Sequence, residues 1–304
     1  MSDNDSSLHP IAKMEANGGP AADAVREISV GHSPDSDDAF MFYGLATSKV
    51  RVPGLKFVHQ LNDIETLNRK AAEDGGQYDV TAISFHAYPY VQQHYALLSC
   101  GGSVGEGFGP VVVASRPAQP AEIGDLTIAV PGTMTTAYLA LRLFAPEVKT
   151  VAMLFDEIIP SVVEGRCDAG LIIHKGNLTY SQQGLFRVVD LGRWWQETQH
   201  LPLPLMGIAV RRSLDPEVSA QVAGAVQASI RFALEHREEA MAYALQFSRA
   251  VDAQLAEQFV AMWVNERALD YGEAGREAVQ RMLRLGYESG VIPHAAEVEF
   301  ISPK

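Results

Sequence analysis

The sequence has few cysteines and no long hydrophobic run. Cys100 and Cys167 are its two cysteines, with neither a CxxC pair nor a disulfide framework, which is typical of a protein from a reducing compartment. The longest apolar runs, such as residues 109–114, are far shorter than the roughly 20 residues that cross a bilayer. We therefore expect no disulfide framework and no membrane span.

Basic residues are also scarce, because 24 Lys and Arg stand against 37 Asp and Glu and give a net charge of −13. Such a chain has no general attraction for phosphate backbones or anionic lipids, so we expect neither nucleic acid nor a membrane as a partner. HExxH and Walker motifs are missing. The first 26 residues lack the basic start and apolar core of a secretory signal, which predicts a flexible tail on a cytoplasmic protein.

From residue 27 short β-type runs alternate with helical runs, a pattern typical of an α/β fold with mainly parallel strands. The predicted strands are 27–31, 55–59, 78–83, 96–100, 111–114, 127–130, 149–153, 169–173, 187–190 and 207–210. The predicted helices between them are 37–48, 63–73, 87–94, 135–143, 156–164 and 191–196. Beyond residue 213 apolar residues recur at three- and four-residue spacing, which predicts helices at 216–236, 238–247, 252–265 and 272–289.

Two apolar runs that end in basic residues, 109–116 and 206–212, enclose a self-contained βαβαβ stretch. One economical arrangement makes these runs the crossovers of a two-lobed protein. Residues 27–116 and 206–304 then form lobe 1, with the C-terminal helices packed on it, and residues 117–205 form an inserted lobe 2. A ligand is expected between the lobes, where strand ends and helix N-termini converge.

The turn at 31–40, GHSPDSDDAF, follows the first predicted strand and opens a helix. Its polar residues suit an N-cap and the positive end of the helix dipole: Ser33, Asp35, Ser36, Asp37 and Asp38. A cation site is the alternative, although the spacing lacks the glycine and the distal glutamate of an EF-hand loop. The glycine-rich run 101–109 precedes a strand rather than a helix, so it predicts a hairpin or hinge.

The turn at 131–138, PGTMTTAY, joins a strand to a helix. Thr135 and Thr136 there present hydroxyls and unpaired N–H groups that suit a carboxylate, with an ordinary threonine cap as the alternative. His174 ends an apolar strand, where an imidazole at the sheet edge suits a proton acceptor, with a structural histidine as the alternative. His32 and His86 also follow strands and are candidates to line the same cleft.

Several stretches in chain order resemble the 1,4-dihydroxy-6-naphthoate synthase family, a late enzyme of the futalosine route to menaquinone. They include NDIETLN at 62–68, the glycine-rich run 101–114, 131–138, the LIIH strand end at 171–174 and the LPLPL run at 201–205. The resemblance implies an α/β, two-lobed fold of the type II periplasmic-binding-protein kind. It also implies a cytoplasmic enzyme that uses neither a metal nor an organic cofactor.

Enzymes of that family convert cyclic dehypoxanthinylfutalosine into 1,4-dihydroxy-6-naphthoate and release a three-carbon fragment. The resemblance implies that His174 is the proton acceptor. It assigns substrate binding to Ser33, Ala82, Ile83, Ser84, Thr135 and Thr136. The family often has a lysine where this chain has Ala82, and Glu-Ser where this chain has Lys175-Gly176, so Lys175 is the candidate to supply the missing charge.

The sequence therefore predicts a carbon–carbon lyase in which a carboxylated bicyclic substrate lies between the lobes and His174 removes a proton. One alternative is a binding protein that captures a small organic carboxylate without chemistry. Another is a chorismate dehydratase of related fold. All three interpretations make a small carboxylate the partner, and none of them fixes the oligomeric state.

Overall fold

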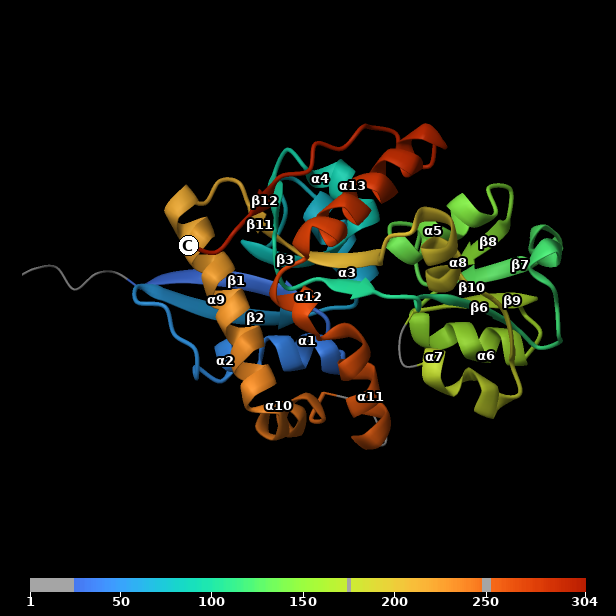
Figure 1. The fold of residues 1–304 in the computed structure, drawn as a ribbon, viewed down its shortest axis with the longest axis horizontal. Helices are drawn as coiled ribbons and strands as arrows, with labels where there is room; N and C mark the ends of the chain where they lie inside the picture. The colour runs from blue at the N-terminus through green and yellow to red at the C-terminus, as the bar shows by residue number, and fades with distance from the viewer. Residues whose placement is uncertain (1–24, 174–175, 248–252) are drawn as a thin grey trace, which may run out of the picture.

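The computed structural model describes residues 25–173, 176–247 and 253–304, which form two sheets lying side by side along the long axis of the molecule (Figure 1). The first sheet has seven strands in the order β12-β4-β11-β3-β1-β2, with β5 paired to β11. Its strands are β1 (Arg26–His32), β2 (Leu55–Leu61), β3 (Val80–Ser84), β4 (Tyr95–Leu98), β5 (Ser103–Gly105), β11 (Leu203–Arg211) and β12 (Phe300–Ile301). The second sheet, in the order β10-β6-β9-β7-β8, contains β6 (Val111–Ala114), β7 (Thr127–Val130), β8 (Lys149–Ala152), β9 (Ala169–Ile172) and β10 (Phe186–Asp190).

Both sheets are mixed, which corrects the prediction of mainly parallel strands. β1 is parallel to β2 and β3, and β7 is parallel to β8 and β9. In contrast, β11 is antiparallel to β3, β4 and β5, and β6 is antiparallel to β9 and β10. The reason is topological: β6 and β11 carry the chain from one sheet into the other, so each enters its sheet against the direction of the βα repeats.

The helices match the sequence periodicity closely. On the two sheets they are α1 (Ser36–Met41), α2 (Tyr43–Ala46), α3 (Ile64–Ala72), α4 (Tyr88–Val91), α5 (Thr136–Phe144), α6 (Ile158–Val163), α7 (Gly176–Thr179) and α8 (Leu191–Gln199). The C-terminal helices are α9 (Pro216–Glu235), α10 (Arg237–Ala244), α11 (Ala253–Trp263), α12 (Glu266–Leu269) and α13 (Gly272–Glu288), and short 3-10 turns are η1 (Phe85–Ala87), η2 (Pro120–Asp125), η3 (Phe155–Glu157) and η4 (Tyr180–Gln183). Asp215 caps α9 by accepting from the Glu217 N–H, with Pro216 at the first helical position.

The chain crosses between the sheets slightly earlier than the sequence predicts. β6, which we assigned to lobe 1, pairs with β9 and β10 in the second sheet. β11 begins at Leu203, so the last residues of the predicted lobe 2 already pair with β5 of the first sheet. Side-chain pattern alone does not reveal which sheet an apolar strand joins, because strands of both sheets are buried.

A buried apolar cluster connects the two lobes. Leu139 of α5 and Trp195 of α8, which cover the second sheet, pack in the same cluster as Val279 and Met282 of α13. All four side chains are fully buried. The lobes are therefore held together by packing as well as by the crossing strands. No helix within these described ranges is long and apolar enough to cross a membrane.

Candidate functional site

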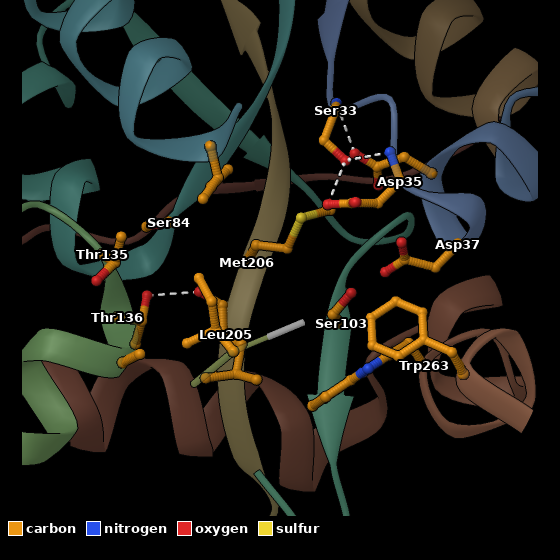
Figure 2. A pocket seen from close by; sticks show the side chains of 15 residues that line it. Ser33, Asp35, Asp37, Ser84, Ser103, Thr135, Thr136, Leu205, Met206 and Trp263 are labelled. Carbon is orange, nitrogen blue, oxygen red and sulfur yellow. Dashed lines mark hydrogen bonds between the residues drawn. The ribbon is translucent and has the colours of Figure 1, made fainter. Parts of the chain in front are cut away.

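A cavity of about 580 Å³, including its open mouth, lies between the two lobes. Its walls come from both lobes: Ser33, Asp35, Asp37, Asp38, Ile64, Ser84, Ser103, Leu205, Met206, Phe259 and Trp263 on the side of the first sheet, and Thr135, Thr136, Ala137 and Ile173 on the side of the second. Figure 2 shows Thr135, Thr136 and Ser84 at one end and the aspartates, Ser103 and Trp263 at the other.

The first end is built on the N-terminus of α5. The Thr135 hydroxyl donates to the Gly132 carbonyl at 3.0 Å and accepts from the Tyr138 N–H at 3.2 Å. The Thr136 hydroxyl donates to the Leu205 carbonyl and accepts from the backbone N–H of His86 at 3.2 Å. Both hydroxyl protons are thus used within the protein. What the helix offers a ligand is its first-turn N–H groups, which have no intrahelical acceptor and favour an anion.

His86 supports this helix start from lobe 1. Its Nδ1 lies 3.1 Å from the Thr135 carbonyl oxygen. Burial lowers the pKa of His86 from 6.5 to about 4, against a smaller opposite effect of that hydrogen bond. The ring is therefore neutral near pH 7 and donates from Nδ1. It does not line the cavity, so its role here is to position Thr135 rather than to exchange protons with a ligand.

Ser84 is held at the end of β3 by a reciprocal pair of hydrogen bonds with Asn68. The Ser84 N–H donates to Asn68 Oδ1 at 2.8 Å, and Asn68 Nδ2 donates to Ser84 Oγ at 3.0 Å. Asn68 Nδ2 also lies 3.4 Å from the Met134 carbonyl of the turn before α5. Because Ser84 Oγ accepts from Asn68, its own proton remains for donation to another acceptor. Ser84 lines the cavity, so a ligand can be that acceptor.

The second end of the cavity is acidic. The Ser33 N–H donates to Asp38 Oδ2 at 2.8 Å, and the Ser33 hydroxyl, 3.3 Å from Asp35 Oδ2, also accepts from the Asp35 N–H. Asp35, Asp37 and Asp38 all line the wall, and Figure 2 shows the first two. Asp35 is the N-cap residue of α1, but its side chain makes no capping hydrogen bond. Among the described residues no group of three His, Cys, Asp or Glu side chains is placed to hold a metal.

The same end contains three residues that the sequence analysis missed as site residues: Ser103, Phe259 and Trp263. Ser103 opens β5, and the other two lie on α11. The glycine-rich run around Ser103 was interpreted only as a hairpin or hinge. For Phe259 and Trp263 the periodicity predicted only a helix over 252–265, and nothing in the sequence distinguishes a residue that packs in the core from one that faces a cavity.

The predicted site residues fall into three groups. Ser33, Ser84, Thr135 and Thr136 line the cavity together. Ala82 and Ile83 do not: both are fully buried inside β3 and pack in apolar clusters on its two faces. His174 and Lys175 lie outside the described residues, while the preceding Ile173 lines the cavity.

His32, a further candidate for the cleft, is buried against other rings instead. Its ring stacks on Phe42 with centroids 4.5 Å apart, and its Nε2 lies 3.0 Å from His59 Nδ1. Burial, and then the neighbouring His59, lower the pKa of His32 to about 3. Burial also lowers the pKa of His59 to about 4. This histidine pair is neutral near pH 7 and belongs to the packing around β1 and β2.

Residues 28–288 match a protein-family model described as menaquinone biosynthesis. The chain is 41% identical over 255 residues to the 1,4-dihydroxy-6-naphthoate synthase of Thermus thermophilus, covering 84% of this chain and 92% of that enzyme. It is 37% identical over 273 residues to the enzyme of the same name from Streptomyces coelicolor, covering 88% of this chain and 95% of that one.

Solved structures are similar as well. The crystal structure of a protein from Archaeoglobus fulgidus matches with a TM-score of 0.83 and 44% identity, covering 88% of this chain and 98% of that chain. A Candida albicans protein with the generic periplasmic-binding-protein fold matches with a TM-score of 0.67 and 13% identity, covering 92% and 98%. At that identity the match shows the fold alone. The predicted two-lobed periplasmic-binding-protein-like fold is confirmed.

Proposed function

The chain belongs to the menaquinone biosynthesis family, with relatives named 1,4-dihydroxy-6-naphthoate synthase, and from this we propose that it converts cyclic dehypoxanthinylfutalosine into 1,4-dihydroxy-6-naphthoate. The proposed reaction is a carbon–carbon cleavage that releases a three-carbon fragment and uses no metal or organic cofactor. The proposed location is the cytoplasm.

The observation that supports this proposal best is the polarity of the interlobe cavity. At one end the first turn of α5 offers N–H groups beside Ser84, and at the other end stand Asp35, Asp37 and Asp38. A carboxylate is stabilised at a helix N-terminus and repelled by aspartates. The substrate carboxylate is therefore proposed to lie at the α5 end, and the hydroxylated part of the molecule at the acidic end, where carboxylates accept from hydroxyl groups.

His174 is proposed as the base, and Lys175 as a second contact for the substrate carboxylate. The support for His174 is its place in the chain, directly after Ile173, which lines the cavity, together with the resemblance of the LIIH strand end. Removal of one proton starts the cleavage, and formation of an aromatic ring supplies much of the driving force. The protein then needs to hold the substrate, provide one base and exclude water.

The test is to incubate the purified protein with cyclic dehypoxanthinylfutalosine and to follow the naphthoate by mass spectrometry. Formation of 1,4-dihydroxy-6-naphthoate without added metal or cofactor is expected. Recovery of unchanged but bound substrate would instead identify a binding protein. If the protein does not convert this substrate but turns over chorismate, it is a chorismate dehydratase. Binding without turnover and turnover of chorismate would each overturn the proposal.

A further inference from the structure

Ser103 and Trp263 form a buried polar pair at the acidic end of the cavity. Ser103 is 5% exposed and Trp263 is 3% exposed, and both line the cavity. Ser103 Oγ and Trp263 Nε1 are buried atoms for which the described part of the chain provides no hydrogen-bond partner. A buried polar atom without a partner costs stability, and these two belong to residues on one cavity wall, where a ligand group can satisfy them.

Both groups are held on regular elements rather than on a loose loop. Ser103 opens β5 and is paired with Met206 across the antiparallel ladder to β11. Trp263 is the last residue of α11, and its ring lies edge-on to Phe108 with centroids 5.1 Å apart. Figure 2 shows the Ser103 hydroxyl pointing from β5 into the space that the labelled side chains surround, with Trp263 beside it. Both residues are therefore placed by regular secondary structure, and the Trp263 ring also by its contact with Phe108.

The chemistry of these groups limits what they recognise. An indole N–H only donates, whereas a serine hydroxyl donates and accepts. The ligand atom at Trp263 must therefore be an acceptor. Asp37 and its two neighbouring aspartates line the same end, which disfavours a carboxylate or phosphate there. The atom that fits is a neutral oxygen, either a hydroxyl or a carbonyl, next to the apolar ring of Phe259.

We propose that Ser103 and Trp263 are specificity-determining residues that bind a neutral hydroxyl or carbonyl oxygen at the end of the substrate opposite its carboxylate. This inference rests on the proposed function for the identity of the substrate. It adds a second binding end to the one at α5, so that the substrate is fixed in one orientation.

A nucleophilic role for Ser103 is the alternative, because residues 101–105 read G-x-S-x-G. That motif works when the serine stands on a sharp turn between a strand and a helix. Here Ser103 begins a strand and no helix follows it before β6. The local structure is that of a fixed hydrogen-bonding hydroxyl, not of an exposed nucleophile.

The test uses the full chain with Ser103→Ala, which removes only a hydroxyl, and Trp263→Phe, which removes the indole N–H together with part of a buried ring. With cyclic dehypoxanthinylfutalosine as substrate, each change should raise KM by about tenfold and leave kcat within about twofold, as for the loss of a contact made equally in ground and transition states. The melting temperature of ligand-free Ser103→Ala should stay equal or rise, because the deleted hydroxyl had no partner among the described residues. The melting temperature of Trp263→Phe should fall, because the change empties part of a buried position.

Two matched variants serve as controls. Ser99 is fully buried, and its Oγ also has no partner within the described residues, but it does not line the cavity. Ser99→Ala should leave KM unchanged. Trp195 Nε1 donates to the Pro202 carbonyl at 3.0 Å away from the cavity. Trp195→Phe should lower the melting temperature and leave KM unchanged.

The outcomes separate this inference from the proposed function. If the wild type turns over the substrate but Ser103→Ala and Trp263→Phe keep its KM, the inference is overturned and the function stands. If the wild type binds without turnover, calorimetric titration decides: about tenfold weaker binding in both variants supports the inference, and equal binding overturns it. If the wild type neither binds nor converts this substrate, both are overturned.

Discussion

His86 is buried beneath the N-terminus of α5, and its replacement by asparagine tests whether a neutral imidazole holds that end of the site together. Its Nδ1 lies 3.1 Å from the Thr135 carbonyl, while its Nε2 is buried and has no partner within the described residues. Asparagine places an N–H donor near the position of Nδ1, so the hydrogen bond to Thr135 can be kept. What the variant loses is the titratable nitrogen.

The direction in which pH changes the unfolding free energy follows from the pKa of His86 in the folded and unfolded states. Burial lowers the pKa of His86 from 6.5 to about 4 in the folded protein. As the pH falls below 6.5, the unfolded chain takes up a proton that the folded protein does not, so stability is complete above 6.5 and is lost as the pH falls toward 4. Between about pH 7.5 and about pH 5 this single group accounts for about 2 kcal/mol of unfolding free energy.

The assay is urea unfolding of both proteins at the two pH values. The loss of unfolding free energy on acidification should be about 2 kcal/mol smaller in His86→Asn than in the wild type. His32 and His59, whose pKa values burial also lowers, contribute equally to both proteins and cancel in the difference. A His94→Asn control at an exposed histidine should retain the wild-type loss. Equal losses in His86→Asn and the wild type would show that His86 is protonated in place without cost, and would refute the argument.

Three further predictions follow from single positions. His174→Ala should abolish turnover of cyclic dehypoxanthinylfutalosine but keep its binding by calorimetry, whereas full activity would remove this histidine from the mechanism. Leu139→Ala should lower the unfolding free energy by about 2–5 kcal/mol in urea melts, since it empties a fully buried position between the lobes. Leu143 in the same cluster is only partly buried, and a loss smaller than that of Leu143→Ala would contradict the packed interface. Gly132→Ala should lower the melting temperature and raise KM. Gly132 has φ +139°, and an added Cβ would lie 2.3 Å from the side chain of Glu65, which accepts from the Met134 N–H. An unchanged KM would show that the turn before α5 does not position the site.

Much of the fold followed from local pattern. The strands 111–114 and 127–130 were predicted with the bounds that the structure has, and the long C-terminal helices were predicted within a few residues. The direction of the strands was not predicted correctly, because strand pairing depends on where the chain re-enters a sheet. The short strands β5 and β12 were also missed, since three or two residues carry no readable periodicity.

The site was predictable where a polar residue ends an element. Ser84 follows from the end of β3, and Thr135 and Thr136 follow from the start of α5. Their hydrogen bonds were not predictable: the proton of the Thr136 hydroxyl goes to Leu205, which is 69 residues away in the chain. Of the hydroxyls and N–H groups that the sequence predicted for the ligand, the structure therefore leaves the N–H groups of the helix start, because both hydroxyl protons bind backbone carbonyls.

By itself the sequence determined the alternation of strands and helices, the acidic turn before α1 and the family resemblance, because each depends on residues that are close together in the chain. Tertiary structure alone decided that Ser103 and Trp263, far apart in the chain, face one cavity, and that Ala82 and Ile83 do not. The physical reason is that burial and hydrogen-bond partnership are properties of packed surfaces. Packing brings together side chains from β5 and α11 that no local spacing relates.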